Sequence, residues 1–122
     1  MTTGIIVFAH GSRVESANQA VRAVAADFAR SGGYAHVEAA FLELGVPNLE
    51  RAADRLAAQG VERMIIIPYF LTLGLHMERD LPTLVSSISK KHKGISISVT
   101  APLDGHPALV EILRSRAAEA IG

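Results

Sequence analysis

Apolar runs with the character of buried strands alternate with segments of helical spacing along this whole chain. The strand-like runs are residues 4–9, 36–42, 61–67 and 95–99. A run that is apolar at nearly every position is typical of a strand covered on both faces. Strands that alternate with helices predict parallel pairing through right-handed crossovers. The sequence therefore predicts an α/β fold: a single three-layer domain over residues 1–122, with a four-stranded parallel sheet and helices on both faces.

The predicted helices have recognisable ends. The pair Gly32-Gly33 closes the first helix, which begins near Glu15, and Asn48 caps the second. Helical spacing returns at Leu81, so Pro82 is predicted to lie in a first turn, where proline is tolerated. A last helix follows from Leu109, with its apolar positions at helical spacing.

Composition excludes several classes of function. Twelve basic residues balance twelve acidic ones, which argues against a nucleic-acid-binding protein. Cysteine is absent, so any metal ion must be held by histidine, carboxylate or water. No signal-peptide pattern is present, and the apolar stretch 64–75 is too short to cross a bilayer. We therefore expect a cytoplasmic protein with no membrane or nucleic-acid partner.

Unusual residues follow the first strand. In parallel α/β sheets, ligands bind at the carboxyl ends of the strands, where the strand order reverses. His10 stands at such an end, and Gly11 would let a ligand approach the backbone. Ser12 offers a hydroxyl group and Arg13 a planar donor for carboxylates. A hydrogen-bonded turn would explain this tetrapeptide equally well.

Two further segments end at the same predicted edge. Glu43 closes the second strand, where a solvated carboxylate is the common alternative. The third strand leads into an apolar loop, residues 68–76, and such loops usually need an apolar partner. His76 ends this loop, although a histidine there could also cap a helix.

Together these strand ends predict a crevice with two imidazoles and one carboxylate, which leaves open positions on a divalent ion. The other histidines are weaker candidates. His36 begins a strand at the opposite edge, and His92 lies in a solvated basic run. His106 follows the fourth strand, where capping of the last helix is the favoured interpretation.

These segments resemble the class II sirohydrochlorin chelatases in their short, single-domain form. The resemblance rests on His10-Gly11-Ser12-Arg13, on Phe41-Leu42-Glu43 with Pro47, and on Pro68-Tyr69-Phe70-Leu71 with Gly74, His76 and Asp80-Leu81-Pro82. The third segment is the most specific, and the three cover nearly the whole chain.

The resemblance implies a reaction and roles for its residues. His10, His76 and Glu43 match the family's metal site, in which the histidines also help to deprotonate the pyrroles. The reaction inserts cobalt, iron or nickel, as a divalent substrate, into sirohydrochlorin, without ATP or an organic cofactor. Short members of the family are homodimers, and a dimer would cover the apolar loop. As candidates for binding the tetrapyrrole we add Ser12, Arg13, Phe70, Leu71 and Gly74, with Arg79 as a weaker one.

Two alternatives stay open at this stage. A non-catalytic carrier of metal or tetrapyrrole would use the same pocket, and only an assay of metal insertion separates it from an enzyme. A phosphoryl-transfer enzyme acting through His10 is disfavoured, because Ala9 stands where an arginine would precede that histidine and no second arginine-rich cluster is present.

Overall fold

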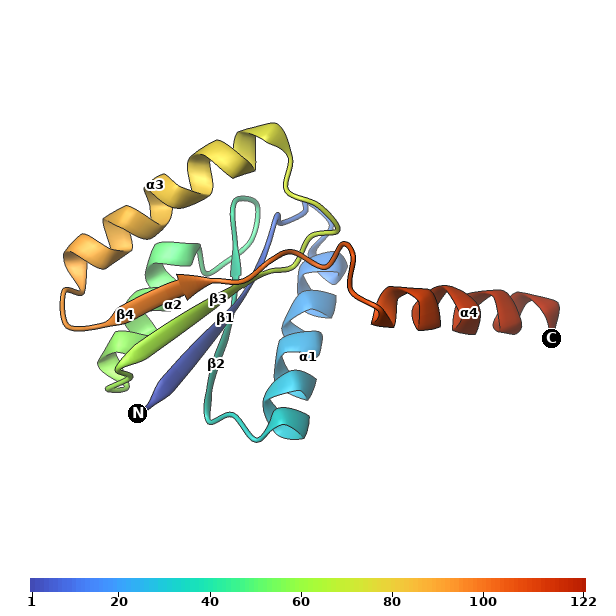
Figure 1. Ribbon diagram of the computed structural model, residues 1–122, viewed down its shortest axis with the longest axis horizontal. Coiled ribbons are helices and arrows are strands. Elements are labelled where there is room, and N and C mark those ends of the chain that lie inside the picture. The colour runs from blue at the N-terminus through green and yellow to red at the C-terminus, as the bar shows by residue number, and fades with distance from the viewer.

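The computed structural model describes residues 1–122 and has the predicted alternation of strands and helices (Figure 1). Its elements are β1 (Thr3–Ala9), α1 (Glu15–Gly32), β2 (His36–Phe41), α2 (Leu49–Ala58), β3 (Arg63–Pro68), α3 (Leu75–Lys91), β4 (Ser96–Val99) and α4 (Ala108–Ile121). The four strands form one parallel sheet in the order β2-β1-β3-β4. The predicted fold class is confirmed.

Helices lie on both faces of the sheet, with α1 on one face and α2 and α3 on the other (Figure 1). The larger core lies beneath α2 and α3. There Ile6 and Phe8 of β1 pack with Met64 and Ile66 of β3, all of them 0–1% exposed. Their neighbours Ile5 and Val7 point to the α1 face, because successive strand residues alternate between faces. This alternation explains why β1 is buried at six consecutive positions.

Two of the predicted helix ends are confirmed. Gly33 follows α1 in the left-handed conformation, with φ of 71°, and its N–H bonds back to the last turn. The Asn48 side chain accepts the backbone N–H of Arg51 and so caps α2.

The predicted position of Pro82 is wrong. Helix α3 begins at Leu75, so Pro82 lies inside the helix and not in its first turn. A proline there leaves one helical carbonyl without its N–H partner. The helix nevertheless continues, because Met77, Leu81 and Ile88 bury its inner face against the core. Packing outweighs the local preference against proline.

His92 is also placed differently from the prediction. Its side chain is only 16% exposed, and its Nε2 atom lies 2.8 Å from Oδ1 of Asp54. Lys91 donates to the other oxygen of that carboxylate at 3.0 Å. The hydrogen bond from Lys91, aided by that from His92, holds the pKa of Asp54 below its usual value. The cluster therefore ties α2 to the end of α3.

The last helix does not cover the sheet. Helix α4 extends away from the rest of the molecule, and none of its residues is buried (Figure 1). It exposes Val110, Ile112, Leu113 and Ile121, each by half or more of its surface. None of the helices combines the length and the apolarity needed to cross a membrane.

Candidate active site

The sheet changes its winding direction between β1 and β3, which are neighbours. The connection from β1 leads to β2 on one side, and the connection from β3 leads to β4 on the other. His10 directly follows β1, and residues 69–74 follow β3. Ligands of parallel α/β proteins bind at such a switch point, so the strand order places His10 where a ligand would bind.

An aromatic side chain supports His10 from below. The imidazole is exposed and contacts the Phe70 ring in a T-shaped arrangement, at a centroid distance of 6.3 Å and an angle of 85°. Phe70 in turn meets the fully buried Phe8 ring at 6.1 Å and 74°. Such edge-to-face contacts are favourable. Phe70 therefore connects the His10 ring to the buried core.

Glu43 lies next to His10 across the strand ends. Its backbone N–H donates to the His10 carbonyl at 3.1 Å, one step beyond the bond from Leu42 to Ala9 at 2.9 Å. Gly11 makes this approach possible. It has a φ of 97°, and a Cβ atom there would lie 1.7 Å from the Glu43 carbonyl oxygen. The structure thus brings together the first two residues predicted for the site.

Asn18 holds the two loops of the site in place. It is 2% exposed and is the one buried polar residue of the chain. Its Oδ1 accepts the Ser12 N–H, and its Nδ2 donates to the carbonyls of Ser12 and Leu44, all at 2.9 Å. The sequence analysis missed Asn18. The available signal was a polar residue in helical register with Val21 and Ala25, on the face that packs against the sheet.

Charged groups of α1 reinforce this connection. Glu15 accepts hydrogen bonds from Asn18 at 3.1 Å and from Arg22 at 3.0 Å, and these bonds lower its pKa, the one from Asn18 most. Arg22 also donates to the Val46 carbonyl at 2.9 Å and lies 5.1 Å from the centre of the Phe41 ring. Asn18 and Arg22, near the start of α1, therefore bind the turn after β2 at two points, the carbonyls of Leu44 and Val46.

Replacing Asn18 by alanine should lower the free energy of unfolding by about 1–3 kcal/mol, because partly buried backbone groups of Ser12 and Leu44 lose their partners. Urea unfolding measures this. Asn18→Asp is the matched control: it keeps the acceptor for Ser12 but turns a carboxylate toward two carbonyls. It should therefore also destabilise the protein. An aspartate variant as stable as the wild type would show that the donated bonds contribute nothing.

The side chain of His76 contacts Arg79 and is not hydrogen-bonded to His10 or Glu43. It is exposed in the first turn of α3, and its Nδ1 atom lies 3.2 Å from Nη2 of Arg79. A guanidinium group only donates, so Nδ1 of His76 is the acceptor in this contact. His76 can bind a metal ion through Nδ1 only after this contact is broken, by movement of Arg79 or rotation of the imidazole ring. No three His, Cys, Asp or Glu residues of the chain are grouped to hold a metal ion in this structure.

The residues predicted to hold a tetrapyrrole have varied surroundings. The Ser12 hydroxyl accepts the Val14 N–H at 3.0 Å and so supports the start of α1. Arg13 and Leu71 are exposed, the latter by 65%. Gly74 precedes α3 with an ordinary φ of −70°, and a Cβ atom there would meet nothing within 4 Å. A side chain could therefore be added at Gly74 without displacing a neighbour.

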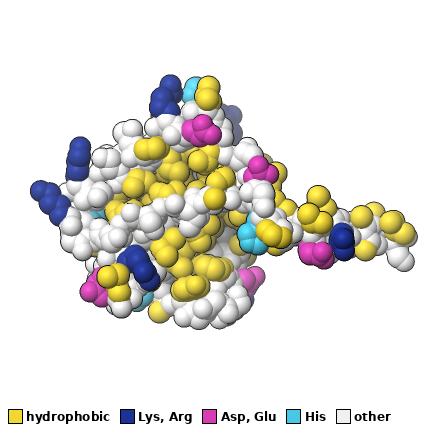
Figure 2. All heavy atoms as spheres, viewed as in Figure 1, with side chains coloured by type: hydrophobic (Ala, Val, Ile, Leu, Met, Phe, Trp, Pro, Cys, Tyr) yellow, Lys and Arg dark blue, Asp and Glu magenta, His cyan; other side chains and the backbone are white.

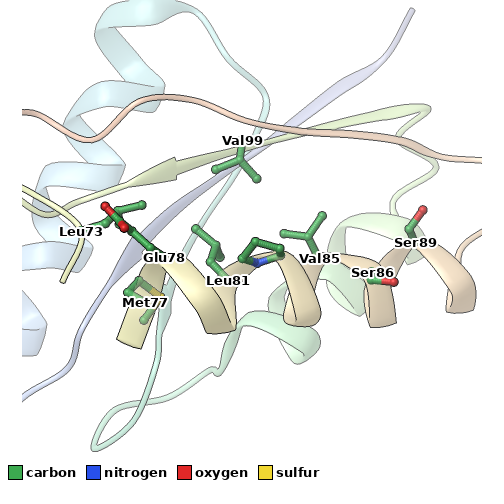
Figure 3. A pocket seen from close by; sticks show the side chains of 9 residues that line it. Leu73, Met77, Glu78, Leu81, Val85, Ser86, Ser89 and Val99 are labelled. Atoms are coloured by element: carbon green, nitrogen blue, oxygen red, sulfur yellow. The ribbon is translucent and has the colours of Figure 1, made fainter. Parts of the chain in front are cut away.

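An apolar groove of about 570 Å³ runs along α3 beside the edge strand β4. Figure 3 shows Leu81 and Val85 of α3 facing Val99 of β4, with Leu73 and Met77 at one end of the groove. Figure 2 shows hydrophobic side chains gathered on this face of the molecule and along α4. The groove is separate from His10 and Glu43, neither of which lines it.

Solved structures and curated relatives identify the class. The sirohydrochlorin chelatase SirB of Bacillus subtilis subspecies spizizenii, in complex with cobalt, matches 98% of this chain with a TM-score of 0.90 and 25% identity. The chloroplastic sirohydrochlorin ferrochelatase of Arabidopsis thaliana is 35% identical over 93% of the chain. The sirohydrochlorin cobaltochelatase of Sulfurisphaera tokodaii is 30% identical over 97% of the chain and matches over 93% of its own length. The fold is that of the sirohydrochlorin chelatases.

The sequence model of the CbiX family matches residues 4–120. The chain therefore belongs to the CbiX family, and the resemblance noted in the sequence is confirmed. It spans about half the length of the Arabidopsis relative and of the Bacillus structure, 50% and 51% respectively. Some relatives of this chain thus match its length, and others are about twice as long.

Proposed function

We propose that this protein inserts a divalent metal ion, cobalt, iron or nickel, into sirohydrochlorin. The observation that supports this most strongly is the backbone hydrogen bond that places Glu43 beside His10 at the switch point of a CbiX-family chain. Similarity to chelatases that act on sirohydrochlorin supplies the substrate. The proposed reaction requires neither ATP nor an organic cofactor and takes place in the cytoplasm.

The proposed chemistry follows from the exchange at the ring, which loses two protons and gains a metal ion. Two pyrrole N–H protons leave, and the ring nitrogens replace the water or protein ligands of the metal ion. An imidazole group can both bind a metal ion and accept a proton near neutral pH. His10 is exposed and contacts Phe70, and it would accept a pyrrole proton or pass on the metal ion. Glu43, next to it, would offset the charge of the ion.

His76 would complete the site once Arg79 has left it. Arg79 also contacts Asp80 at 3.4 Å, so the guanidinium group already shares its donors among exposed partners. A carboxylate of the tetrapyrrole can compete for such a group, because arginine binds carboxylates with two parallel hydrogen bonds. Substrate binding would then free the His76 ring to ligate the metal ion.

The direct test is an absorbance time course. Purified protein is mixed with sirohydrochlorin and cobalt(II), then iron(II) and nickel(II), beside protein-free mixtures. Metal insertion changes the spectrum of the ring, so acceleration over the protein-free rate supports the proposal, and the rates rank the metals. Binding of the ring with no acceleration would instead identify a carrier of the tetrapyrrole.

Replacing Glu43 by glutamine should slow metal insertion about tenfold, since the charge that attracts the metal ion is lost while the shape is kept. The exposed side chain makes no contribution to the core, so the unfolding temperature should stay near that of the wild type. Steady-state rates at several cobalt concentrations measure the effect. A rate equal to that of the wild type would reduce Glu43 to a structural residue of the turn.

We further propose that the protein is a homodimer. Single chains expose two apolar surfaces, α4 and the groove between α3 and β4, which a second copy would cover. Relatives of double length carry two such lengths of chain in one molecule. Sedimentation equilibrium should therefore give twice the chain mass of 13.0 kDa. A mass of 13.0 kDa at micromolar concentration would contradict the dimer.

A further inference from the structure

Leu44 has a backbone conformation that its side chain disfavours. Its φ is 58°, and it is the one non-glycine residue of the chain with positive φ. In this left-handed region the Cβ atom of an L-residue crowds the following carbonyl, so glycine and asparagine are the usual occupants. The Leu44 side chain is 51% exposed, so half of it lies outside the protein's own packing. The fold by itself favours a different residue here.

The surroundings hold this turn in its shape whichever side chain stands at position 44. On one side, Gly11 leaves space for the Glu43 carbonyl. On the other, a Cβ atom on Gly45 would lie 2.8 Å from the Phe41 ring. Asn18 donates to the Leu44 carbonyl at 2.9 Å. Strained residues persist where neighbours fix them in this way, and they are concentrated at functional sites.

The position of Leu44 indicates what its side chain contacts. It directly follows Glu43, whose main chain is bonded to that of His10. Other large apolar side chains are exposed in the segment that follows β3: Leu71 by 65% and Leu75 by 83%. Leu75 is the residue before His76. Exposed apolar side chains thus adjoin Glu43 and His76 in the sequence, and of these Leu44 alone has a strained backbone.

We propose that Leu44 is a substrate-binding residue that packs against the flat face of the tetrapyrrole ring and holds it over His10 and Glu43. The inference rests on the proposed function. The carboxylates of such a ring lie on its rim, while its two faces are apolar. Because leucine is apolar, contact with a face of the ring buries apolar surface, whereas contact with the charged rim does not. The strain at Leu44 is retained because the side chain binds substrate.

Two variants separate strain from contact. Leu44→Asn relieves the backbone and removes the apolar contact. It should raise the unfolding temperature by about 2–5 °C and weaken binding of metal-free sirohydrochlorin about tenfold. Leu44→Met is the matched control, because it keeps an apolar side chain of similar reach. It should match the wild type in both measurements. Fluorescence titration with sirohydrochlorin in the absence of metal measures the affinity.

Each outcome of these measurements either supports or overturns the role of Leu44. Greater stability with weaker ring binding in Leu44→Asn alone supports the inference. Unchanged affinity overturns it, and so does a lower unfolding temperature, which would mean that Leu44 packs on its own chain. Affinity restored by raising the protein concentration would show that Leu44 contacts a second copy instead, and overturns it too. Wild-type protein that binds the ring without speeding metal insertion would refute the proposed function but not the role of Leu44. Wild-type protein that does not bind the ring refutes both.

Discussion

Replacing His10 by alanine is expected to slow metal insertion by about 100-fold or more, since proton transfer by a positioned side chain typically contributes that much. The exposed imidazole makes one aromatic contact, with Phe70, and lies outside the buried core. The unfolding temperature should therefore change by no more than a few degrees. The rate is measured from the absorbance of the ring, and folding from circular dichroism of the same sample.

The same test at His76 examines the second predicted ligand. His76→Ala should slow insertion to a similar extent, and its bond with Arg79 is too exposed to affect stability. His36→Ala is the matched control, because His36 begins β2 at the opposite edge of the sheet and bonds Gln59 at 2.7 Å. Normal turnover in either His10→Ala or His76→Ala would overturn the roles assigned to these residues.

The sequence predicts the fold well because the signals involved are local and repeated. Continuous apolar runs identify β1 and β3, Asn48 caps the start of α2, and Gly33 follows the end of α1, as predicted. Parallel pairing then forces the carboxyl ends of the strands to one edge. The proximity of His10 and Glu43 follows from that topology without any knowledge of side-chain positions.

What the sequence does not predict depends on contacts between distant segments. Helix α3 extends through Pro82 because its inner face packs on the core, an effect that no local preference reveals. Asn18 resembles an ordinary polar helix residue until the turn after β2, 26 positions away, supplies a carbonyl for it. The positive φ of Leu44 likewise arises from the neighbours of the turn, so the residue type gives no warning of it.

Replacing Gly11 by alanine is expected to be the most destabilising single methyl addition in the chain. The new Cβ atom would lie 1.7 Å from the Glu43 carbonyl oxygen, and φ at this position is 97°. A backbone atom cannot swing away as a flexible side chain can. The free energy of unfolding should therefore fall by about 3–5 kcal/mol, combining backbone strain with overpacking. Urea unfolding measures the loss.

The same substitution should also remove activity from the fraction that stays folded. Relief of the clash requires the loop after β1 to separate from the turn after β2, which breaks the bond between His10 and Glu43. Gly94→Ala is the control, because a Cβ atom there meets nothing within 4 Å. It should leave stability and turnover close to those of the wild type. If Gly11→Ala were as stable and as active as Gly94→Ala, the close approach of the two loops would be irrelevant to the site. Loss of both properties would show that a single glycine sets the spacing between the proposed metal ligand and its carboxylate.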